Sequence, residues 1–403
     1  MRKFFKSSTR SYFLNGIILL LLFLPFNLFG SIIQSIITIG ILIFNSSLNF
    51  TKKLSPIKLG LLFCIICSFL YVGISQVNIH THSILKIFNI LLIISFFPLT
   101  DNFNISRKVV IGSLLFILLT QLSYMFKINF IVDFIDKYYT SEDYFSSYET
   151  LALEGGIGGF LNFRFGGIFR NPNQCGRVLT LLFAIFMVNK NKIYKQDYLV
   201  FGGFICAVLL TGSRTSLLIF SLLAAVYLIY IKKNTKILNY LIIPLLGISL
   251  TFFLDFDSRI FDFSELIGSG KQASVNAKYD FLAAYTQSTL DRGSYDFFFG
   301  TFTIDEARYI FPGVHLNRFD SEIGYLIHGL GIFATLFIFL FYLKIFLISN
   351  VKTRFIMILL IWAITSTVLT NFRFATLFMI VLSMYYYSPN FIEFKSAHPQ
   401  VNK

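Results

Sequence analysis

The sequence predicts an all-α polytopic membrane protein with about twelve transmembrane helices and two large non-cytoplasmic loops. The first observation is composition: of 403 residues, 56% are hydrophobic and only 13% are charged, and the mean hydropathy is +0.72. Soluble domains carry about 25% charged and about 45–50% apolar residues. The second observation is that apolar stretches of about 20 residues, long enough to span a bilayer, recur along the whole chain. Together these observations exclude a soluble domain larger than a loop.

Twelve apolar stretches are predicted to be membrane-spanning helices, although the two short final ones are also compatible with a re-entrant hairpin. The basic start Met1–Arg10 and the apolar run after it are expected to form an uncleaved first helix, because no small-residue cleavage site is present. The predicted helices are Tyr12–Phe29, Ser31–Phe50, Ile57–Gln76, Ser83–Thr100, Lys108–Lys127, Asn173–Val188, Tyr198–Thr211, Arg214–Ile231, Ile237–Leu254, Ile323–Phe346, Phe355–Thr370 and Phe374–Tyr387.

The helices and loops divide the chain into five predicted units. Both loops contain aromatic and apolar residues and are expected to fold back on the membrane surface, with a surface helix at Ala273–Thr289. The units are 1–128 with helices 1–5, 129–172 as the first large loop, 173–254 with helices 6–9, 255–322 as the second large loop, and 323–403 with helices 10–12 and a cytoplasmic tail.

Loop charges predict the orientation. With a cytoplasmic N-terminus, 20 of the 34 Lys and Arg residues and only three of the 20 acidic residues lie on the cytoplasmic side. Cytoplasmic loops of membrane proteins carry an excess of Lys and Arg, so both termini are predicted to be cytoplasmic. The net charge of +14 therefore reports topology, and nucleic acid is not needed to explain it.

Arginine is distributed differently from lysine. Only four of the 20 cytoplasmic-side cations are arginine, whereas nine of the 14 outward ones are. Topology does not distinguish the two residues, but the planar guanidinium grips phosphate or carboxylate at two points. The outward arginines are therefore a first indication of function, with pairing to outward acids as the alternative for most of them.

Two other patterns give no function of their own. Cys64 and Cys67 form a C-x-x-C inside an apolar run, where a redox motif is not expected, and the four cysteines do not make a disulfide framework. The glycine run Glu154–Gly167 lacks the G-K-[ST] ending of a nucleotide-binding loop. We expect it to be a flexible loop or hinge whose glycines permit close approach to a bulky substrate.

A turn followed by a cationic helix start lies at the end of the first loop. The Asn-Pro-Asn that ends at Asn173 is a turn and helix-start signal, and its Asn side chains can cap the helix. Arg170 precedes this start, and Arg177 lies one or two turns inside the helix. Arginine beside a helix N-terminus suits an anion, so these three residues are predicted to bind substrate. A cap with a snorkelling arginine is the alternative.

Arg214 lies in the tight turn joining two predicted spans, at or within the membrane boundary. A cation is unfavourable at that depth, and Ser or Asn would make the turn equally well. The position favours a functional role over a snorkelling anchor.

The end of the second loop carries a base, a cation and two acids. His315, Arg318, Asp320 and Glu322 lie within eight residues, just before a predicted span. Acids suit a helix N-terminus, so a solvated cap explains the two acids but not His315, which can act as a general base. His328, inside the predicted helix, is expected to be a packing or interhelical hydrogen-bonding residue.

Three motifs in this order resemble the O-antigen polymerase and O-antigen ligase superfamily of bacterial polysaccharide assembly. The likeness covers about Arg164–Phe346 and the overall topology. The motifs are R-x-x-G-x-x-x-N-P-N with Arg164, Gly167 and Asn171–Asn173, then T-x-S-R-T-S at Thr211–Ser216, then H-x-N-x-x-D-S-E before a G-x-G helix at His315–Gly331.

The resemblance implies a GT-C-like glycosyltransferase of the bacterial inner membrane that needs no metal or cofactor and has its site at the periplasmic face. A polymerase of this family moves a growing glycan from undecaprenyl pyrophosphate onto the next lipid-linked repeat unit. The implied partners are the undecaprenyl-pyrophosphate-linked oligosaccharide, the lipid bilayer and a chain-length regulator protein.

The resemblance also assigns roles. Arg214 matches the family's boundary arginine and His315 its histidine before the last long span, so these two and Glu322 are expected to be catalytic. The substrate-binding set is Arg164, Arg170, Asn173, Arg177, Lys278, Arg318 and Asp320. The family's basic residue in the middle of the second loop is not uniquely matched, because Lys271 and Lys278 both fit.

Two alternatives remain open. A ligase of the same superfamily transfers the glycan to lipid A core instead. A lipid-linked oligosaccharide flippase or other transporter belongs to a different class and places ionisable residues at mid-membrane, often within inverted repeats. This sequence has few charges at mid-depth and gathers its ionisable groups at one face, which favours the enzyme.

Overall fold

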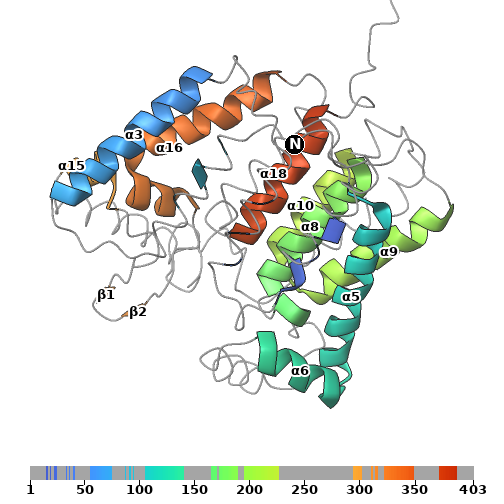
Figure 1. Cartoon of the computed structure of the whole chain (residues 1–403). Helices are drawn as coiled ribbons and strands as arrows, with labels where there is room; N and C mark the ends of the chain where they lie inside the picture. The colour runs from blue at the N-terminus through green and yellow to red at the C-terminus, as the bar shows by residue number, and fades with distance from the viewer. Residues whose placement is uncertain are drawn as a thin grey trace, which may run out of the picture.

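The chain is helical, with one short β-hairpin among the residues described (Figure 1). The computed structural model describes residues 15–16, 19, 22–24, 33, 36, 40, 55–74, 87, 90–91, 94, 105–139, 165–169, 172–188, 195–226, 294–301, 310–311, 314–315, 322–348 and 372–387. The elements are α3 Ser55–Ile74, α5 Arg107–Met125, α6 Asn129–Tyr139, η1 Gly167–Phe169, α8 Pro172–Val188, α9 Lys195–Leu210, α10 Arg214–Val226, α15 Ser294–Phe299, β1 Ile310–Phe311, β2 Val314–His315, α16 Glu322–Ile348 and α18 Phe372–Tyr387.

Three of these helices are long and apolar enough to cross a membrane. They are Pro56–Ile74, Arg107–Met125 and Leu326–Lys344, and the shorter apolar helices are Asp197–Leu210, Ser216–Ala225 and Phe374–Met384. The prediction of a helical chain is confirmed for the described residues, and three of its helices are candidate membrane spans. Seven predicted spans coincide with α3, α5, α8, α9, α10, α16 and α18.

Other predicted helices fall wholly or mostly outside the described residues: Tyr12–Phe29, Ser31–Phe50, Ser83–Thr100, Ile237–Leu254, Phe355–Thr370 and the surface helix Ala273–Thr289. The two predicted loops contain regular elements that the sequence pattern did not predict. The helix α6 opens the first loop, and α15 and the β1–β2 hairpin lie in the second.

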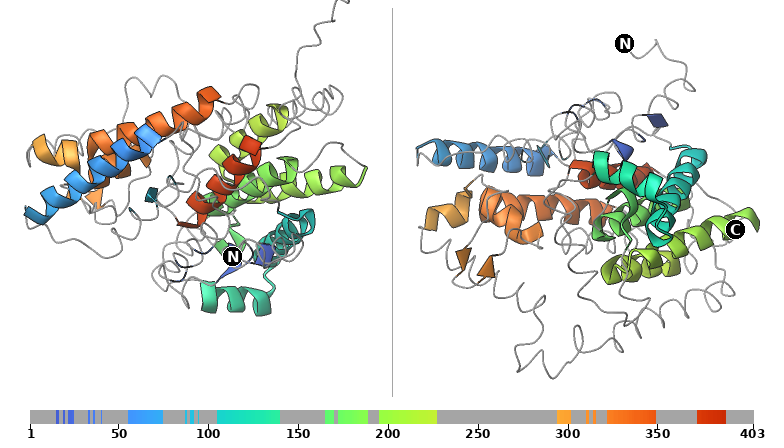
Figure 2. Two further views of the ribbon diagram at one scale, coloured as in Figure 1. Left: turned by 45° about the horizontal axis from the view of Figure 1, so that its top comes forward. Right: turned by 90° about the horizontal axis from the view of Figure 1, so that it is seen from below.

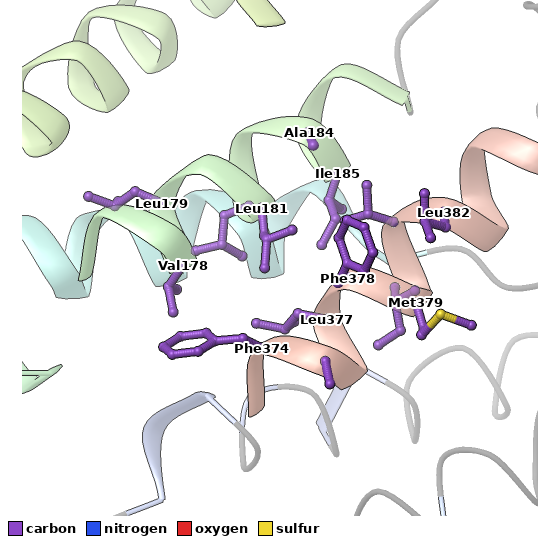
Figure 3. Close-up of a cluster of buried hydrophobic side chains, with 14 of the residues drawn as sticks. Val178, Leu179, Leu181, Ala184, Ile185, Phe374, Leu377, Phe378, Met379 and Leu382 are labelled. Carbon is purple, nitrogen blue, oxygen red and sulfur yellow. The ribbon is translucent and has the colours of Figure 1, made fainter. Parts of the chain in front are cut away.

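Aromatic packing joins α8, α9 and α10. The ring of Phe183 on α8 lies 4.4 Å from that of Phe220 on α10 and 5.4 Å from that of Phe204 on α9, measured between centroids. All three side chains are fully buried. Figure 3 shows the apolar side chains of α8 and α18 facing each other, with Leu181 and Phe378 among them. This packing fixes the helices that carry the first two motifs.

Contacts at the two ends of α5, α8 and α9 show that α8 runs antiparallel to both α5 and α9. At one end, Arg107 at the start of α5 pairs with buried Asp197 near the start of α9 and lies 5.6 Å from the ring of Phe186 near the end of α8. At the other end, Gln121 of α5 contacts the start of α8 and the end of α9. The sequence orientation assigns the first end to the cytoplasm and the second to the outside.

The helices α3 and α16 lie side by side and antiparallel (Figures 1 and 2). Gly60 near the start of α3 packs directly beneath the ring of Phe337 in α16. Farther along, Ser68 donates a hydrogen bond to the carbonyl oxygen of Leu330 at 3.3 Å. Tyr71 donates one to Asp296 of α15 at 2.7 Å. These contacts join the end of the second loop to the spans.

The helix α16 is broken at Gly331, where φ is 78° and ψ is 169°. Its carbonyl groups before the break need other donors, and Thr301 donates from its backbone N–H to the oxygen of His328 at 2.8 Å. The hydroxyl of Ser68 lies 3.3 Å from the oxygen of Leu330 and 2.8 Å from that of Cys64, and its one proton is shared between these two acceptors. Gly300, with φ +76°, packs against the backbone of the break. The break is therefore stabilised by contacts with α3 and with the two residues that follow α15, Gly300 and Thr301.

Candidate functional site

The end of the first loop is hydrogen-bonded to α5. Gln121 is completely buried, and its Nε2 donates hydrogen bonds to the carbonyl oxygens of Phe165 at 2.9 Å and Ala207 at 3.1 Å. The N–H of Phe165 donates in turn to the oxygen of Leu210 at 2.8 Å. One side-chain amide therefore links the end of the loop to the C-terminal end of α9.

Gly167 shows why glycine is needed at the end of the glycine run. Its φ is +54°, and a Cβ there would lie 2.5 Å from the hydroxyl of Thr120 and 3.3 Å from the side chain of Gln121. Close approach was predicted for this run, but at Gly167 the neighbour is the protein's own α5 and not a substrate. The described end of the run, Phe165–Gly167, is held by the hydrogen bonds at Phe165. The rest of the run lies outside the described residues, so the hinge stays a prediction.

The Asn-Pro-Asn signal starts a helix as predicted. The first residue of α8 is Pro172, one residue before the predicted start, where proline's missing N–H is not needed. Asn173 in this first turn is exposed. Arg177, one turn farther, is half-buried, and its guanidinium carbon lies 5.8 Å from the centroid of the Phe374 ring at the start of α18.

The second motif forms a tight, hydrogen-bonded turn between α9 and α10. Gly212 has φ +54°, and its N–H donates to the oxygen of Leu209 at 2.9 Å. The hydroxyl of Thr211 accepts from the N–H of Ser213 at 3.1 Å, and the Ser213 hydroxyl donates to that of Ser216 at 2.9 Å. Arg214 is therefore the first residue of α10, at the end of a rigid turn.

The helix that follows the first motif meets the second motif at Gly176. A Cβ on this residue would overlap the side chain of Ser216 and approach that of Ser213 to 3.4 Å. Glycine therefore lets the first turns of α8 and α10 touch. Arg177 follows Gly176 directly, and Arg214 starts the helix that Gly176 contacts. Two helix N-termini and two arginine positions thus lie at one end of the bundle, an arrangement that suits an anion.

Substituting Gly176 tests this contact. Gly176→Ala is expected to lower the free energy of unfolding by about 1–3 kcal/mol, because Cβ must displace a serine side chain in a packed interface. Ser216→Gly removes the obstructing atoms, although it destabilises the protein itself by losing the hydrogen bond to Ser213. In the Ser216→Gly background, adding Gly176→Ala should therefore cost much less stability than it does in the wild-type chain. Thermal unfolding in detergent measures both.

The control for this pair is Gly202→Ala in α9, where nothing lies within 4 Å of the added Cβ. It should be neutral or slightly stabilising, since alanine is the better helix former. Equal melting temperatures for Gly176→Ala and Gly202→Ala would contradict the contact.

The remaining predicted site residues are located less completely. Arg214, His315 and Glu322 are placed by their backbone only: Arg214 starts α10, His315 pairs with Ile310 in the hairpin, and Glu322 starts α16. The residues Arg164, Arg170, Lys278, Arg318 and Asp320 lie outside those that the structure describes. The structure thus places the helix after the first motif against the second motif. That the third motif lies near them stays a prediction.

Several polar residues near these motifs were not predicted. Gln121 is hydrogen-bonded to the end of the first loop. In the second loop, Asp296 accepts a hydrogen bond from Tyr71, and Thr301 donates one to the carbonyl oxygen of His328. A glutamine inside an apolar span was a usable signal, because intramembrane polar groups need partners. His328 is buried with its Nε2 3.4 Å from the Thr301 hydroxyl, which confirms it as a packing residue.

Comparison of the chain with protein-family models, with curated proteins and with solved structures gives no match.

Proposed function

We propose that this chain is a polysaccharide polymerase of the O-antigen type, which transfers a growing glycan from undecaprenyl pyrophosphate onto the next lipid-linked repeat unit. The supporting observation is the contact of Gly176 with Ser213 and Ser216, which brings the start of α8, directly after the first motif, against the second motif. That end is the outward one in the orientation that the loop charges predict. The third motif enters the proposal through the sequence resemblance alone.

The proposed chemistry relies on cations more than on a nucleophile. The acceptor hydroxyl oxygen bonds to the anomeric carbon while the bond from that carbon to the pyrophosphate oxygen breaks. The departing group is dianionic or more highly charged, so arginines stabilise it best when they grip two oxygens at once. Arg214 and Arg177, beside the starts of α10 and α8, are proposed to do this.

The acceptor proton needs a base, and we assign it to His315 or Glu322. His315→Ala is expected to slow polymerisation by about 10²–10⁴-fold while leaving binding of the lipid-linked donor largely intact. The measurement is polymerisation of purified lipid-linked repeat units, with donor binding followed separately. A well-inserted His315→Ala protein with the wild-type rate removes His315 from the mechanism.

The proposal includes twelve spans in the bacterial inner membrane, with both termini cytoplasmic and the site periplasmic. Reporter fusions test this orientation. Fusions at Asn191 and Asn234 should report the cytoplasm, and fusions at Ser147 and Gly270 should report the periplasm, because of the loop charges. A periplasmic signal at Asn234 contradicts the orientation and the site assignment with it.

Loss of the gene product separates the proposed polymerase from a ligase. A polymerase deletion leaves lipid A core carrying a single repeat unit in place of a ladder of chain lengths. A ligase deletion instead leaves core with no repeat unit, while long polymer accumulates on undecaprenyl pyrophosphate. A chain-length regulator, the proposed protein partner, should alter ladder length only when this chain is present.

A further inference from the structure

An exposed apolar stripe runs along α5. Leu115, Leu119, Leu122 and Phe126 recur at helical spacing and are all exposed, Phe126 to 67%. Because α5 is one of the three candidate spans, this stripe faces lipid. Phe126 caps the helix at the outward end, so the stripe continues to the point where the chain leaves the span.

The helix α6 starts three residues after Phe126 and is fixed to the spans. Figure 1 shows it running across the end of α5. Asp136 accepts a hydrogen bond from Tyr124 of α5 at 2.7 Å, Tyr139 donates one to the oxygen of Phe23 at 2.7 Å, and Ile135 is buried. Among the described residues, no element covers the other face of α6, where Phe130 and Phe134 are exposed.

That uncovered face is divided lengthwise into an aromatic and a charged edge. Phe130 and Phe134 lie one turn apart and are 83% and 49% exposed. Asp133 and Lys137, also one turn apart, are exposed beside them. A helix with a row of large aromatics next to a row of charges matches the boundary between acyl chains and headgroups.

We propose that α6 lies in the outward interface of the bilayer, with Phe130 and Phe134 inserted among phospholipids and Asp133 and Lys137 at the aqueous side. The exposed stripe of α5 supports lipid as the occupant, because its last residue, Phe126, leads directly into the aromatic edge. Since α6 also contacts η1, it sets the end of the first loop at headgroup depth. The proposal does not depend on the proposed function.

Tryptophan fluorescence tests the placement of α6. The chain has one tryptophan, Trp362, which is first replaced by phenylalanine. Single tryptophans are then introduced as Phe130→Trp, Phe134→Trp and, as the matched control on the charged edge, Asp133→Trp. Each full-length variant is reconstituted in phosphatidylcholine vesicles, with or without phosphatidylcholine brominated on acyl carbons near the headgroup.

The brominated lipid should quench the emission of Phe130→Trp and Phe134→Trp about twofold, while aqueous acrylamide quenches them weakly. Asp133→Trp should show the reverse, with strong acrylamide quenching and little lipid quenching. Acrylamide quenching of Phe130→Trp and Phe134→Trp equal to that of Asp133→Trp overturns the proposal. Emission quenched by neither agent also overturns it, because a protein surface then covers the face.

Discussion

Replacing Arg214 with lysine is expected to reduce polymerisation about 100-fold, the effect of removing one electrostatic contact to a developing charge. Lysine keeps the positive charge, but it cannot hold two oxygens of a departing pyrophosphate in a fixed fork. The backbone of Arg214 is placed by the turn before it, in which Gly212 has a positive φ and the hydroxyl of Ser213 is hydrogen-bonded to that of Ser216. The rate is measured with purified lipid-linked repeat units.

The matched control for this substitution is Arg107→Lys. Arg107 pairs with Asp197 at the opposite end of the same helices, and a lysine there retains an ion pair. Its polymerisation rate should stay within a few-fold of wild type. Full activity of a well-inserted Arg214→Lys variant reduces Arg214 to a snorkelling anchor. Equal losses in both variants assign the effect to general destabilisation of the bundle.

Replacing Gly331 with alanine is expected to lower the free energy of unfolding by about 3 kcal/mol, from backbone strain together with steric overlap. Its φ of 78° and ψ of 169° suit only glycine. An added Cβ would overlap the carbonyl group of Phe298 and come within 2.6 Å of the carbonyl carbon of Phe299. The substitution therefore separates α15 from α16.

Under the proposed function, activity should fall along with stability in this variant, because the half of α16 before the break begins with Glu322, one of the two proposed bases. Thermal unfolding in detergent measures the first effect, with Gly73→Ala in α3 as control, where nothing lies within 4 Å of the new Cβ. Gly331→Ala melting at the same temperature as Gly73→Ala would show that the helix does not require the break.

Apolar length and start signals made several helices predictable. The Asn-Pro-Asn signal placed the start of α8 within one residue, since proline at the first helical position is itself a local preference. The start of α10 was predicted at the residue where it is found, Arg214, because a tight turn between two apolar runs restricts where the second helix can begin. These helix starts depend on neighbouring residues only, so they could be predicted from the local sequence.

The features that the sequence did not reveal depend on contacts between distant residues. The break at Gly331 requires donors from Ser68 and Thr301, which lie in other segments. The helix α6 mixes aromatic and charged residues, because one face packs on α5 and the other is exposed. The role of Gly176 becomes visible only when α10 lies against it.

The most direct test of the proposed function uses the purified chain in vesicles with undecaprenyl-pyrophosphate-linked repeat units as sole substrate. The proposal predicts a ladder of glycan lengths, with one undecaprenyl pyrophosphate released for each bond formed and no requirement for added metal. A folded, inserted protein that leaves the repeat units unextended contradicts the polymerase assignment. Transfer that appears only when lipid A core is added shows the ligase instead.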